Sequence, residues 1–525
     1  MSFAVALVVA GIAGFIGLSY ELLWFRVVSY ASWSLPGAFG LLLAAYLFGI
    51  AIGSRIAGYF CKDEAQAGDA KQLRGLAIFT FFANIVAWLV VPAFGWNAKL
   101  HEWPPALIAV GIAAAMLGAI LPLVAHFGIK PDDKAGVNLS YVYLANIIGS
   151  SAGSLTTGFV FLDHWSLQTI AAVVACIGMA LVAGLLFLSD LKLPMRAGAI
   201  VGTVIAACIL CASTPKVYDR IWERLLYKKT FDEETTKFLD VVETKSGVIT
   251  VTADGTVYGG GAYDGRVSTN VQYDRNGIFR AHAIGAMHPN PKNVLMIGLA
   301  TGAWAQVVGN LPTVEKLTVV EINPGYLELI GKYKEVRSVL TNPKIDIQID
   351  DGRRWLNRHP ASRFDAIVMN TTWNWRAHST NLLSVEFLEL ARQRLAPGGI
   401  LYFNTTGSDD AKKTAASTYP YAMRVYNFVA VSDAPFTFDL ARWKTVLTTM
   451  KIDGEPVVDM KDPNIDAFMS DMLAYPDSLS EPPKDDGLES RVSLLANPNV
   501  AAARIITDDN MVPEWRQVIR FQDAL

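Results

Sequence analysis

A glycine-containing turn and a carboxylate follow two consecutive predicted strands in the second half of the sequence. The turn Gly298-Leu-Ala-Thr301-Gly302 ends a buried strand, 293–298, and Glu321 ends the next strand, 317–320. Turn glycines let the backbone approach a ligand closely, and a carboxylate about 20 residues further on can accept both hydroxyl protons of a ribose. This pattern predicts a nucleoside site, of a kind shared by NAD enzymes and S-adenosylmethionine enzymes. Its candidate binding residues are Gly298, Thr301, Gly302 and Glu321.

Two further strands bring polar side chains to the same edge. A third strand, 345–349, ends in Asp350-Asp351, where a carboxylate can accept a hydrogen bond from an adenine amino group. A fourth strand, 364–370, ends at Asn370 and opens into the cleft. Each carboxylate alone would also fit a helix N-cap. Together, on successive strand ends, the acidic residues favour nucleoside binding.

The elements around these residues predict a Rossmann-like, doubly wound sheet, which binds ligands at the carboxyl ends of its strands. A helix is expected over 384–395 and another strand over 400–404. Before them, the strand-like sequence from Leu239 and the turns at Asp254-Gly255 and Asp264-Gly265 predict a small antiparallel sheet.

The first part of the chain is strongly apolar. Hydrophobic residues make up 52% of the sequence, and nearly all long apolar runs lie before Pro215. A membrane-spanning helix needs about 20 such residues. The sequence therefore predicts a multi-pass α-helical membrane bundle of about seven helices. The expected spans are Phe3–Leu23, Gly37–Ile56, Leu73–Phe94, Ala106–Phe127, Leu139–Phe161, Ile170–Leu188 and Ala197–Cys211.

Composition divides the chain into four expected parts. They are a transmembrane domain over 1–214, a basic juxtamembrane linker over 215–238, a small β subdomain over 239–290 and a Rossmann-like domain over 291–525. Basic residues occur in loops on both faces of the bundle, so the positive-inside rule does not decide the orientation. We expect a protein of the cell membrane with its soluble part in the cytoplasm, where a nucleoside ligand is made.

Glu21 lies near the end of the first expected span. An ionisable residue at membrane depth is costly and indicates a functional site by default, which makes Glu21 a membrane-site candidate. The alternative is an interfacial Glu21 that caps the helix or pairs with Arg26. Small residues at 49–53 and 149–153 have the spacing that allows close helix packing.

Charge and cysteine content exclude several functions. The net charge of −3 argues against nucleic-acid binding, which usually needs a concentrated basic face. The soluble part has no cysteine, so we expect no disulfide framework and no zinc site there. The region 408–484 contains helix-compatible patches at 411–424 and 465–474, followed by a Pro- and Asp-rich link at 481–487. We assign that region no chemistry.

Several stretches of the soluble part match one family pattern. They are Ala262-Tyr-Asp-Gly265, His282 through His288-Pro-Asn-Pro291, Val294-Leu-Met-Ile-Gly298, Val319-Val-Glu-Ile-Asn323, Asp351-Gly352, Leu383-Ser-Val-Glu-Phe387 and Leu395-Ala-Pro-Gly-Gly399. From Leu239 to Asn404 the chain resembles the spermidine synthase (polyamine aminopropyltransferase) family, and the whole chain resembles its membrane-fused members. The resemblance implies a β-domain before a Rossmann-like domain, a nucleoside held at Glu321 and Asp351, and usually a homodimer.

Two departures from the family pattern bear on the substrate. At the turn 298–302 the family has Gly-Gly-Gly-Asp-Gly, and its aspartate holds the ammonium group of decarboxylated S-adenosylmethionine. This chain has Thr301 at the position of that aspartate. The family also has Asp-Ser-Ser-Asp where this chain has Asn370-Thr371-Thr372-Trp373, and its first aspartate is the base for the attacking amine. A buried ammonium without a carboxylate is disfavoured. Neutral Thr301 beside backbone N–H groups would instead suit the carboxylate of intact S-adenosylmethionine.

The candidate catalytic residues are Asn370, Trp373 and His378. Trp373 could stack over a sulfonium as a cation-π partner or meet an apolar acceptor from the bilayer. The alternative is that the tryptophans of this stretch only seal the cleft. His378 is a candidate base, with the alternative that it is a bystander in a loop.

These observations predict a membrane-bound enzyme that uses S-adenosylmethionine or its decarboxylated form as co-substrate, without a metal. It would catalyse alkyl or aminopropyl transfer, or breakdown at the sulfonium, and release methylthioadenosine. The acceptor would be a small molecule, free or lipid-borne. The alternative is a polyamine or nucleoside transporter or sensor with a non-catalytic synthase-like domain, although transporters usually show internal repeats with broken helices.

Overall fold

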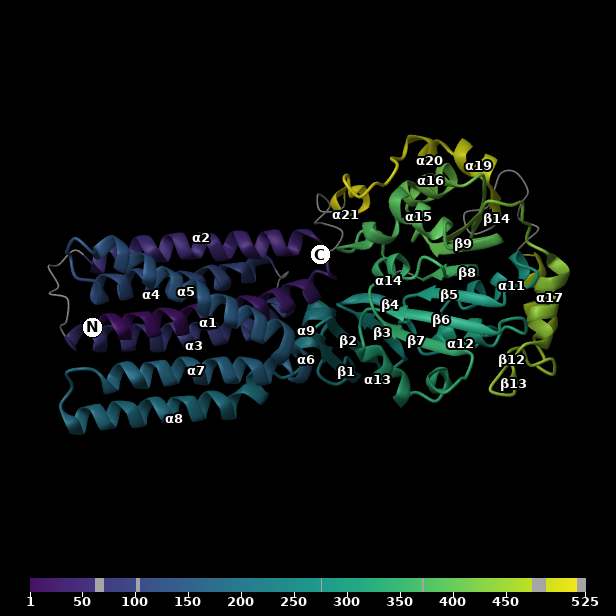
Figure 1. Cartoon of the computed structure of the whole chain (residues 1–525). Helices are drawn as coiled ribbons and strands as arrows, with labels where there is room; N and C mark the ends of the chain where they lie inside the picture. Colours follow the sequence, from purple (N-terminus) through teal and green to yellow (C-terminus); the bar gives the residue numbers. More distant parts are fainter. Residues whose placement is uncertain (62–69, 101–103, 275, 371–372, 475–487, 517–525) are drawn as a thin grey trace. The chain divides into compact units, whose positions relative to one another are not determined.

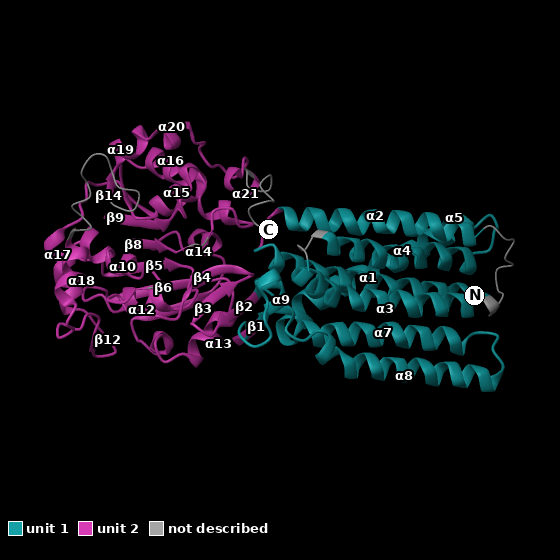
Figure 2. Ribbon diagram, turned by 180° about the vertical axis from the view of Figure 1, so that it is seen from behind, with its two compact units in different colours: residues 1–33, 37–237, 243–247 teal, residues 34–36, 238–242, 248–525 magenta. Residues whose placement is uncertain are grey.

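The computed structural model describes the chain except for residues 62–69, 101–103, 275, 371–372, 475–487 and 517–525. The chain forms two compact units (Figure 2). Unit 1 comprises residues 1–33, 37–237 and 243–247, and unit 2 comprises 34–36, 238–242 and 248–525. Thr371, Thr372 and the expected link 481–487 lie outside the described residues. The expected domain boundaries stay predictions.

Unit 1 is built from long helices (Figure 1). They are α1 (Phe3–Ala31), α2 (Gly37–Phe60), α3 (Ala70–Leu100), α4 (Leu107–Gly128), α5 (Ala135–Thr156), α7 (Leu167–Phe187) and α8 (Leu193–Val217). Shorter helical turns are η1 (Pro104–Ala106), the π-helical η2 (Thr157–Phe161), α6 (Leu162–His164), α9 (Ile221–Tyr227) and η3 (Lys228–Thr230).

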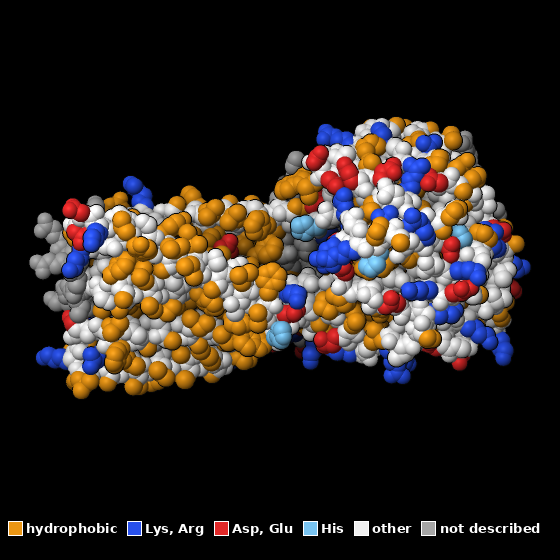
Figure 3. All heavy atoms as spheres, in the orientation of Figure 1, with side chains coloured by type: hydrophobic (Ala, Val, Ile, Leu, Met, Phe, Trp, Pro, Cys, Tyr) orange, Lys and Arg blue, Asp and Glu red, His pale blue; other side chains and the backbone are white. Residues whose placement is uncertain are grey.

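Within the described residues, six helices are long and apolar enough to cross a membrane, namely α1, α2, α3, α4, α7 and α8. Figure 3 shows hydrophobic side chains spread over the visible face of the long helices. α5 falls short because Asn138, Ser140 and Asn146 interrupt its apolar sequence. The prediction of a multi-pass helical bundle is confirmed, although the expected span 139–161 is less apolar than the others.

Glycines allow two pairs of helices in unit 1 to pack closely. A Cβ atom at Gly149 of α5 would lie 1.8 Å from the carbonyl oxygen of Gly11 in α1. A Cβ atom at Gly53 of α2 would lie 1.8 Å from the carbonyl oxygen of Ala115 in α4. No side chain fits at either position without moving the helices apart. The predicted packing role of the small residues at 49–53 and 149–153 is confirmed.

The Gly149→Ala variant should lower the thermal unfolding temperature of the detergent-solubilised protein, because its methyl group would force α1 and α5 apart. Overpacking of this kind typically costs about 1–3 kcal/mol. Gly136→Ala is a matched control on the same helix, since nothing lies within 4 Å of a Cβ atom there. Circular-dichroism melting of both variants is the measurement. Equal melting temperatures for Gly149→Ala and the wild type would contradict the close α1–α5 contact.

Arg26 of α1 bonds to backbone groups. Its Nη2 donates to the carbonyl oxygen of Thr244 and, at 3.0 Å, to that of Gly247. The ion pair with Arg26, one form of the alternative interpretation of Glu21, is not formed in the described part of unit 1, where Arg26 bonds to backbone carbonyl groups instead. Glu21 itself is half-buried on α1, and its role as a membrane site stays a prediction.

Unit 2 contains two main sheets. The strands of the four-stranded sheet are β1 (Phe238–Thr244), β2 (Gly247–Thr252), β3 (Thr256–Gly259) and β4 (Ala262–Arg266). The strands of the eight-stranded sheet are β5 (Asn293–Ile297), β6 (Lys316–Glu321), β7 (Ile345–Ile349), β8 (Phe364–Met369), β9 (Leu395–Asn404), β10 (Tyr421–Val425), β11 (Phe428–Ser432) and β14 (Leu488–Ser490). A separate two-stranded ribbon pairs β12 (Lys451–Ile452) with β13 (Glu455–Pro456).

The large sheet is the predicted doubly wound sheet with an antiparallel extension. Its order is β14-β10-β11-β9-β8-β5-β6-β7. Strands β9, β8, β5, β6 and β7 run parallel to one another. Strands β11, β10 and β14 extend the sheet beyond β9, and each is antiparallel to its neighbour. The order of the parallel strands reverses beside β5, where β8 and β6 flank it. Ligands of such sheets bind at the carboxyl ends of the strands near this reversal. The predicted fold class is confirmed.

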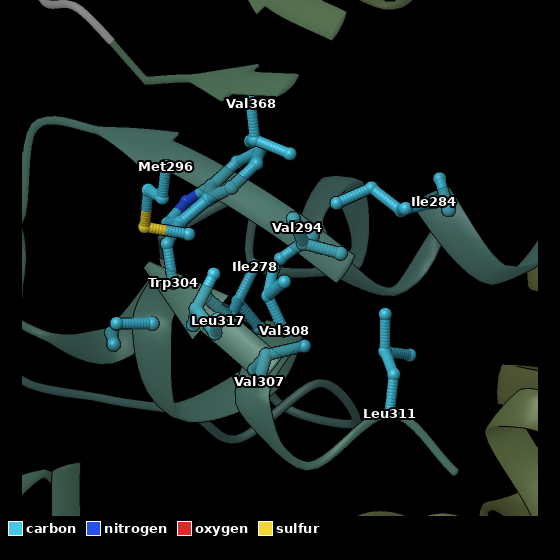
Figure 4. Packing of buried hydrophobic residues seen from close by; sticks show 14 of the residues in the cluster. Ile278, Ile284, Val294, Met296, Trp304, Val307, Val308, Leu311, Leu317 and Val368 are labelled. Carbon is cyan, nitrogen blue, oxygen red and sulfur yellow. The ribbon is translucent and has the colours of Figure 1, made fainter. Parts of the chain in front are cut away.

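β5 lies at the centre of this sheet and is buried on both faces. On one face, Val294 and Met296 pack with Trp304 of the following helix (Figure 4). On the other face, Leu295 and Ile297 belong to a second hydrophobic cluster. A continuous apolar strand is typical of a parallel sheet that is covered on both sides. The core therefore fixes the end of β5, which leads directly into the glycine turn.

The helices of unit 2 cover the sheet and connect its strands (Figure 1). They are α10 (Phe279–His282), α11 (Ile284–Met287), α12 (Ala303–Gly309), α13 (Gly325–Lys332), α14 (Gly352–Arg358), α15 (Val385–Arg392), α16 (Asp409–Thr418), α17 (Leu440–Thr449), α18 (Ile465–Ala474), α19 (Arg491–Ala496), α20 (Pro498–Ala502) and α21 (Val512–Arg516), with the short turns η4 (Arg337–Leu340) and η5 (Ser379–Leu382). The helix-compatible patch 465–474 is confirmed. The patch 411–424 is helical only to Thr418, because 421–424 pairs with β11 as strand β10.

Candidate functional site

The glycine turn between β5 and α12 has a backbone that only small residues adopt easily. Gly298 has a φ of 92° and Gly302 a φ of 79°, and Ala300 between them has a φ of 46°. A Cβ atom at Gly302 would also lie 2.9 Å from Cδ1 of Ile330. Gly302 is therefore required both by its backbone conformation and by the close approach of α13.

Glu321 at the end of β6 contacts this turn. Its Oε2 accepts hydrogen bonds from the N–H groups of Leu299 at 2.7 Å and Ala300 at 3.4 Å, and its Oε1 accepts one from Asn323 at 2.8 Å. Burial raises the pKa of the Glu321 carboxyl group, and these backbone N–H groups partly oppose the rise. The fold thus brings together the turn and the carboxylate that the sequence singled out.

The two aspartates after β7 have different environments. The Asp351 side chain caps α14 by accepting a hydrogen bond from the Arg354 N–H at 2.8 Å. Asp350 forms ion pairs with the side chains of Arg354 and Arg358. Asp351 is therefore a helix N-cap, as the alternative interpretation expected. The Asp350 carboxylate is already paired with two arginine side chains. A role of either residue in adenine binding stays a prediction.

A pocket of about 640 Å³ lies beside the ends of β8 and β9. It brings together Asn370 and Trp373, two of the three candidate catalytic residues. Its described lining residues are Tyr263, Asp264, Gly265, Asn276, Arg280, Asn370, Trp373, Asn404, Thr406, Gly407, Lys412, Arg424, Tyr426 and Asn427. Amides and aromatic rings dominate this wall, and Asp264 is its one acidic member within the described residues.

The Trp373 indole is held in place by its neighbours. Its Nε1 donates to the carbonyl oxygen of Tyr263 at 3.1 Å, and its ring stacks on Trp375 with centroids 5.6 Å apart. Asn370 accepts a hydrogen bond from Asn404 Nδ2 at 3.3 Å. Both side chains of the predicted pair therefore line one wall of the pocket in a defined arrangement.

His378 is not part of this pocket. Its side chain is exposed, and its backbone N–H donates to Glu514 Oε2 at 3.0 Å. A φ of 69° places it at the start of the short turn η5. The loop geometry that follows Trp373 thus carries His378 away from Asn370, and the bystander alternative describes it better.

Thr301 is buried next to the β4 end of the pocket. It is 4% exposed, and its Oγ1 accepts a hydrogen bond from the Ala303 N–H at 3.3 Å. Its Cγ2 lies 3.4 Å from the position of a Cβ atom on Gly265. Thr301 therefore adjoins the pocket wall that carries Asp264. Aspartate in place of Thr301 would add a second carboxylate to this region.

Sequence reasoning did not single out two residues that line the pocket, Asp264 and Arg280, or Tyr326, which contacts Asp264. Asp264 accepts a short hydrogen bond from the Tyr326 hydroxyl, which holds its carboxylate beside the pocket. Arg280 reaches the same pocket from α10. The match at 262–265 pointed to Asp264, whereas Arg280 and Tyr326 have no local sequence signal. Within the described residues, no group of three His, Cys, Asp or Glu side chains could hold a metal ion.

Asp508, near the C-terminal end of the described residues, connects two helices. Its carboxylate accepts hydrogen bonds from Arg353 of α14 at 2.6 Å and from the Ser384 hydroxyl, which caps α15, at 2.6 Å. The hydrogen bond and charge of Arg353 lower the pKa of Asp508. Its described partners give Asp508 a structural role.

Comparison with known proteins identifies one family. Residues 280–431 match the family model described as the spermine/spermidine synthase domain. The chain is 23% identical over 457 residues to the polyamine aminopropyltransferase of Mycobacterium tuberculosis (strain CDC 1551 / Oshkosh), covering 82% of this chain and 84% of that protein. It is also 23% identical to polyamine aminopropyltransferase 1 of Streptomyces coelicolor, covering 81% of each.

A solved spermidine synthase, in complex with the transition-state analogue AdoDATO, is also similar. It is 18% identical, covers 45% of this chain and 89% of its own, and has a TM-score of 0.35. The domain match and the relatives that span most of the chain fit the doubly wound sheet and the long apolar helices described above. The chain therefore contains a spermine/spermidine synthase domain preceded by long apolar helices, and polyamine aminopropyltransferases are its distant relatives over 82% of its length.

Proposed function

We propose that the protein is a membrane-bound enzyme that binds an S-adenosyl sulfonium and transfers or eliminates the chain attached to its sulfur. The observation that carries this proposal is the contact between Glu321 and the glycine turn, beside a pocket whose candidate catalytic positions are neutral. The turn and Glu321 would hold the ribose, Asp351 would accept from adenine, and the sulfonium would face Asn370 and Trp373.

The chemistry needs little from the protein beyond positioning. A nucleophile forms a bond to the carbon next to sulfur, the carbon–sulfur bond breaks, and its electron pair stays on sulfur as neutral methylthioadenosine. An amine nucleophile also loses a proton, whereas a carboxylate does not. Elimination, in which the neighbouring carbon loses a proton to water, or ring closure, in which the carboxylate of intact S-adenosylmethionine is the nucleophile, would give the same nucleoside product. Because the sulfonium is already a good leaving group, correct orientation supplies much of the rate.

The neutral residues Thr301 and Asn370 favour a substrate other than the usual diamine. A diamine and the aminopropyl group both carry ammonium ions, which need carboxylates when they are buried. Thr301 would allow the carboxylate of intact S-adenosylmethionine to approach, because it brings no negative charge. Trp373 would stabilise the sulfonium through its ring face.

The proposal also covers the location and orientation of the protein in the membrane. We infer a multi-pass protein of the cell membrane, with the synthase domain in the cytoplasm where its co-substrate is made. The acceptor is a small molecule, free or lipid-borne, and the active form is a homodimer, as is usual in the family. Protease accessibility in sealed, inside-out vesicles tests the orientation, since only a cytoplasmic domain is cleaved there.

The enzymatic proposal is tested by incubating the detergent-purified protein with S-adenosylmethionine or its decarboxylated form, each with and without putrescine or membrane lipid. Mass spectrometry then follows the nucleoside products. We expect methylthioadenosine from intact S-adenosylmethionine. Spermidine formed only from the decarboxylated form and putrescine would contradict the altered pocket.

A non-catalytic sensor is the second candidate, favoured by the exposed position of His378 and by an asparagine where the family has its catalytic base. It predicts nucleoside binding without turnover in all mixtures.

A further inference from the structure

The guanidinium group of Arg280 lies in the wall of the pocket, and among the described residues its hydrogen bonds go only to uncharged oxygen atoms. Its Nε donates to the carbonyl oxygen of Gly277 at 2.7 Å, and its Nη2 donates to that of Asn276 at 2.9 Å. Its Nη1 donates to Asn427 Oδ1 at 2.5 Å. Arginine has five N–H donors. Among the described residues, two donors therefore remain unused, one on each terminal nitrogen.

The positive charge of Arg280 is also unbalanced. The two other basic residues that line the pocket have carboxylate partners: Lys412 pairs with Asp409 at 2.9 Å, and Arg424 with Glu489 at 2.7 Å. In the described part of the chain, no carboxylate pairs with Arg280. Among the described residues, Arg280 is thus the one basic member of the pocket lining without an ion-pair partner, which leaves it available to a ligand.

Aromatic rings hold this cation in place. The guanidinium carbon of Arg280 lies 5.0 Å from the ring centroid of Phe428, 5.5 Å from that of Tyr426 and 6.0 Å from that of Trp304. These contacts and the three hydrogen bonds fix the plane of the group before any ligand arrives. A fixed guanidinium with one free N–H on each terminal nitrogen suits the two oxygens of a carboxylate or phosphate.

We propose that Arg280 binds an oxyanion, a carboxylate or a phosphate, carried by the molecule that reacts in this pocket. This inference rests on the proposed function, because it names the chemical class of that molecule. The oxyanion has two possible sources. One is the carboxylate of intact S-adenosylmethionine, and the other is an anionic group on the acceptor. In either case a diamine is repelled by Arg280.

Two variants test the proposal by different routes. Arg280→Gln removes the charge. Asn427→Asp keeps Arg280 and its hydrogen bond but supplies a carboxylate to it, so it tests charge balance even if Arg280→Gln fails to fold. Lys451→Gln, an exposed residue outside the pocket lining, is the charge-matched control.

The measurement is the dissociation constant of the full-length protein for three nucleosides by isothermal titration calorimetry. They are S-adenosylmethionine, its decarboxylated form and methylthioadenosine. If the co-substrate supplies the oxyanion, the wild type binds intact S-adenosylmethionine about 10- to 100-fold more tightly than the decarboxylated form, as expected for hydrogen bonds to a charged group. Both variants then reduce this ratio to near 1 and leave methylthioadenosine binding unchanged.

If the acceptor supplies the oxyanion, the variants leave that ratio unchanged. Inorganic phosphate, titrated into protein saturated with methylthioadenosine, then binds to the wild type and Lys451→Gln at least about 10-fold more tightly than to either variant. The proposal is overturned if both variants match the wild type in the ratio and in phosphate binding. Phosphate binding that depends on Arg280, in a protein that binds no nucleoside, would overturn the proposed function and leave the oxyanion site standing.

Discussion

Replacing Glu321 with glutamine should weaken binding of S-adenosylmethionine and methylthioadenosine about 100-fold, as expected from losing charge-assisted hydrogen bonds worth about 1.5–3 kcal/mol each. The carboxylate accepts from the N–H groups of Leu299 and Asn323. A glutamine amide nitrogen cannot accept, so one of these N–H groups would be left without its partner. The same change removes the charge that would accept the ribose hydroxyl protons. Calorimetric titration of the full-length variant measures the loss.

Glu328→Gln is the matched control, because Glu328 is an exposed residue of α13 that pairs only with Lys332 among the described residues. It should bind both nucleosides like the wild type. Wild-type affinity in Glu321→Gln would show that the nucleoside does not bind at the end of β6.

The pH dependence of binding should identify the same carboxylate. Burial raises the pKa of Glu321, so this group takes up a proton at a higher pH than an ordinary glutamate. In the proposed site the ribose hydroxyls would donate to the ionised form, so protonation should oppose binding. Nucleoside affinity should fall as the pH is lowered, beginning above the usual range of a glutamate. Glu321→Gln should show little of this dependence, and an unchanged pH profile in that variant would assign the titration to another group.

Restoring the two family aspartates should reverse the preference for the co-substrate. In Thr301→Asp/Asn370→Asp, a buried carboxylate would be placed near Asp264, and a second one at the end of β8. Intact S-adenosylmethionine should lose affinity at least about 10-fold through repulsion of its carboxylate, while the ammonium group of the decarboxylated form should compensate the added charges. Competition between the two nucleosides for the purified variant measures the change in preference.

The unliganded double variant should also melt below the wild type, because like charges in a buried region destabilise a fold. The decarboxylated nucleoside should restore more of its melting temperature than the intact one. Thr341→Asp/Asn342→Asp adds the same charge in the loop before β7 and is the control. An unchanged preference in the pocket variant would mean that Thr301 and Asn370 do not face the reacting end of the nucleoside.

The local patterns of the sequence predicted the centre of the fold well. β7 occupies 345–349 as expected, and β5 and β8 end within one residue of their predicted ends. Continuous apolar runs followed by a glycine or an acidic residue are strong local signals for buried parallel strands. The close helix contacts at Gly53 and Gly149 were also predictable, because small residues at this spacing act through their immediate neighbours.

Contacts between distant segments were not predictable in this way. Residues 421–424 look helical beside the preceding helix but form strand β10, because they pair with β11. Arg280 is held at the pocket by a hydrogen bond to Asn427 and by the rings of Tyr426 and Phe428. These residues lie about 150 positions further along the chain, so no local pattern could predict the contact. His378 is the opposite case, since nearness to Trp373 in sequence did not bring its side chain among the described residues that line the pocket, and its role as a base stays a prediction.

Equilibrium dialysis of radiolabelled S-adenosylmethionine against the detergent-purified full-length protein tests the central claim most directly. We predict saturable binding that methylthioadenosine displaces and that Glu321→Gln weakens about 100-fold, while Glu328→Gln binds like the wild type. Absence of saturable binding, or equal binding by the wild type and Glu321→Gln, would contradict a nucleoside site built from the glycine turn and Glu321.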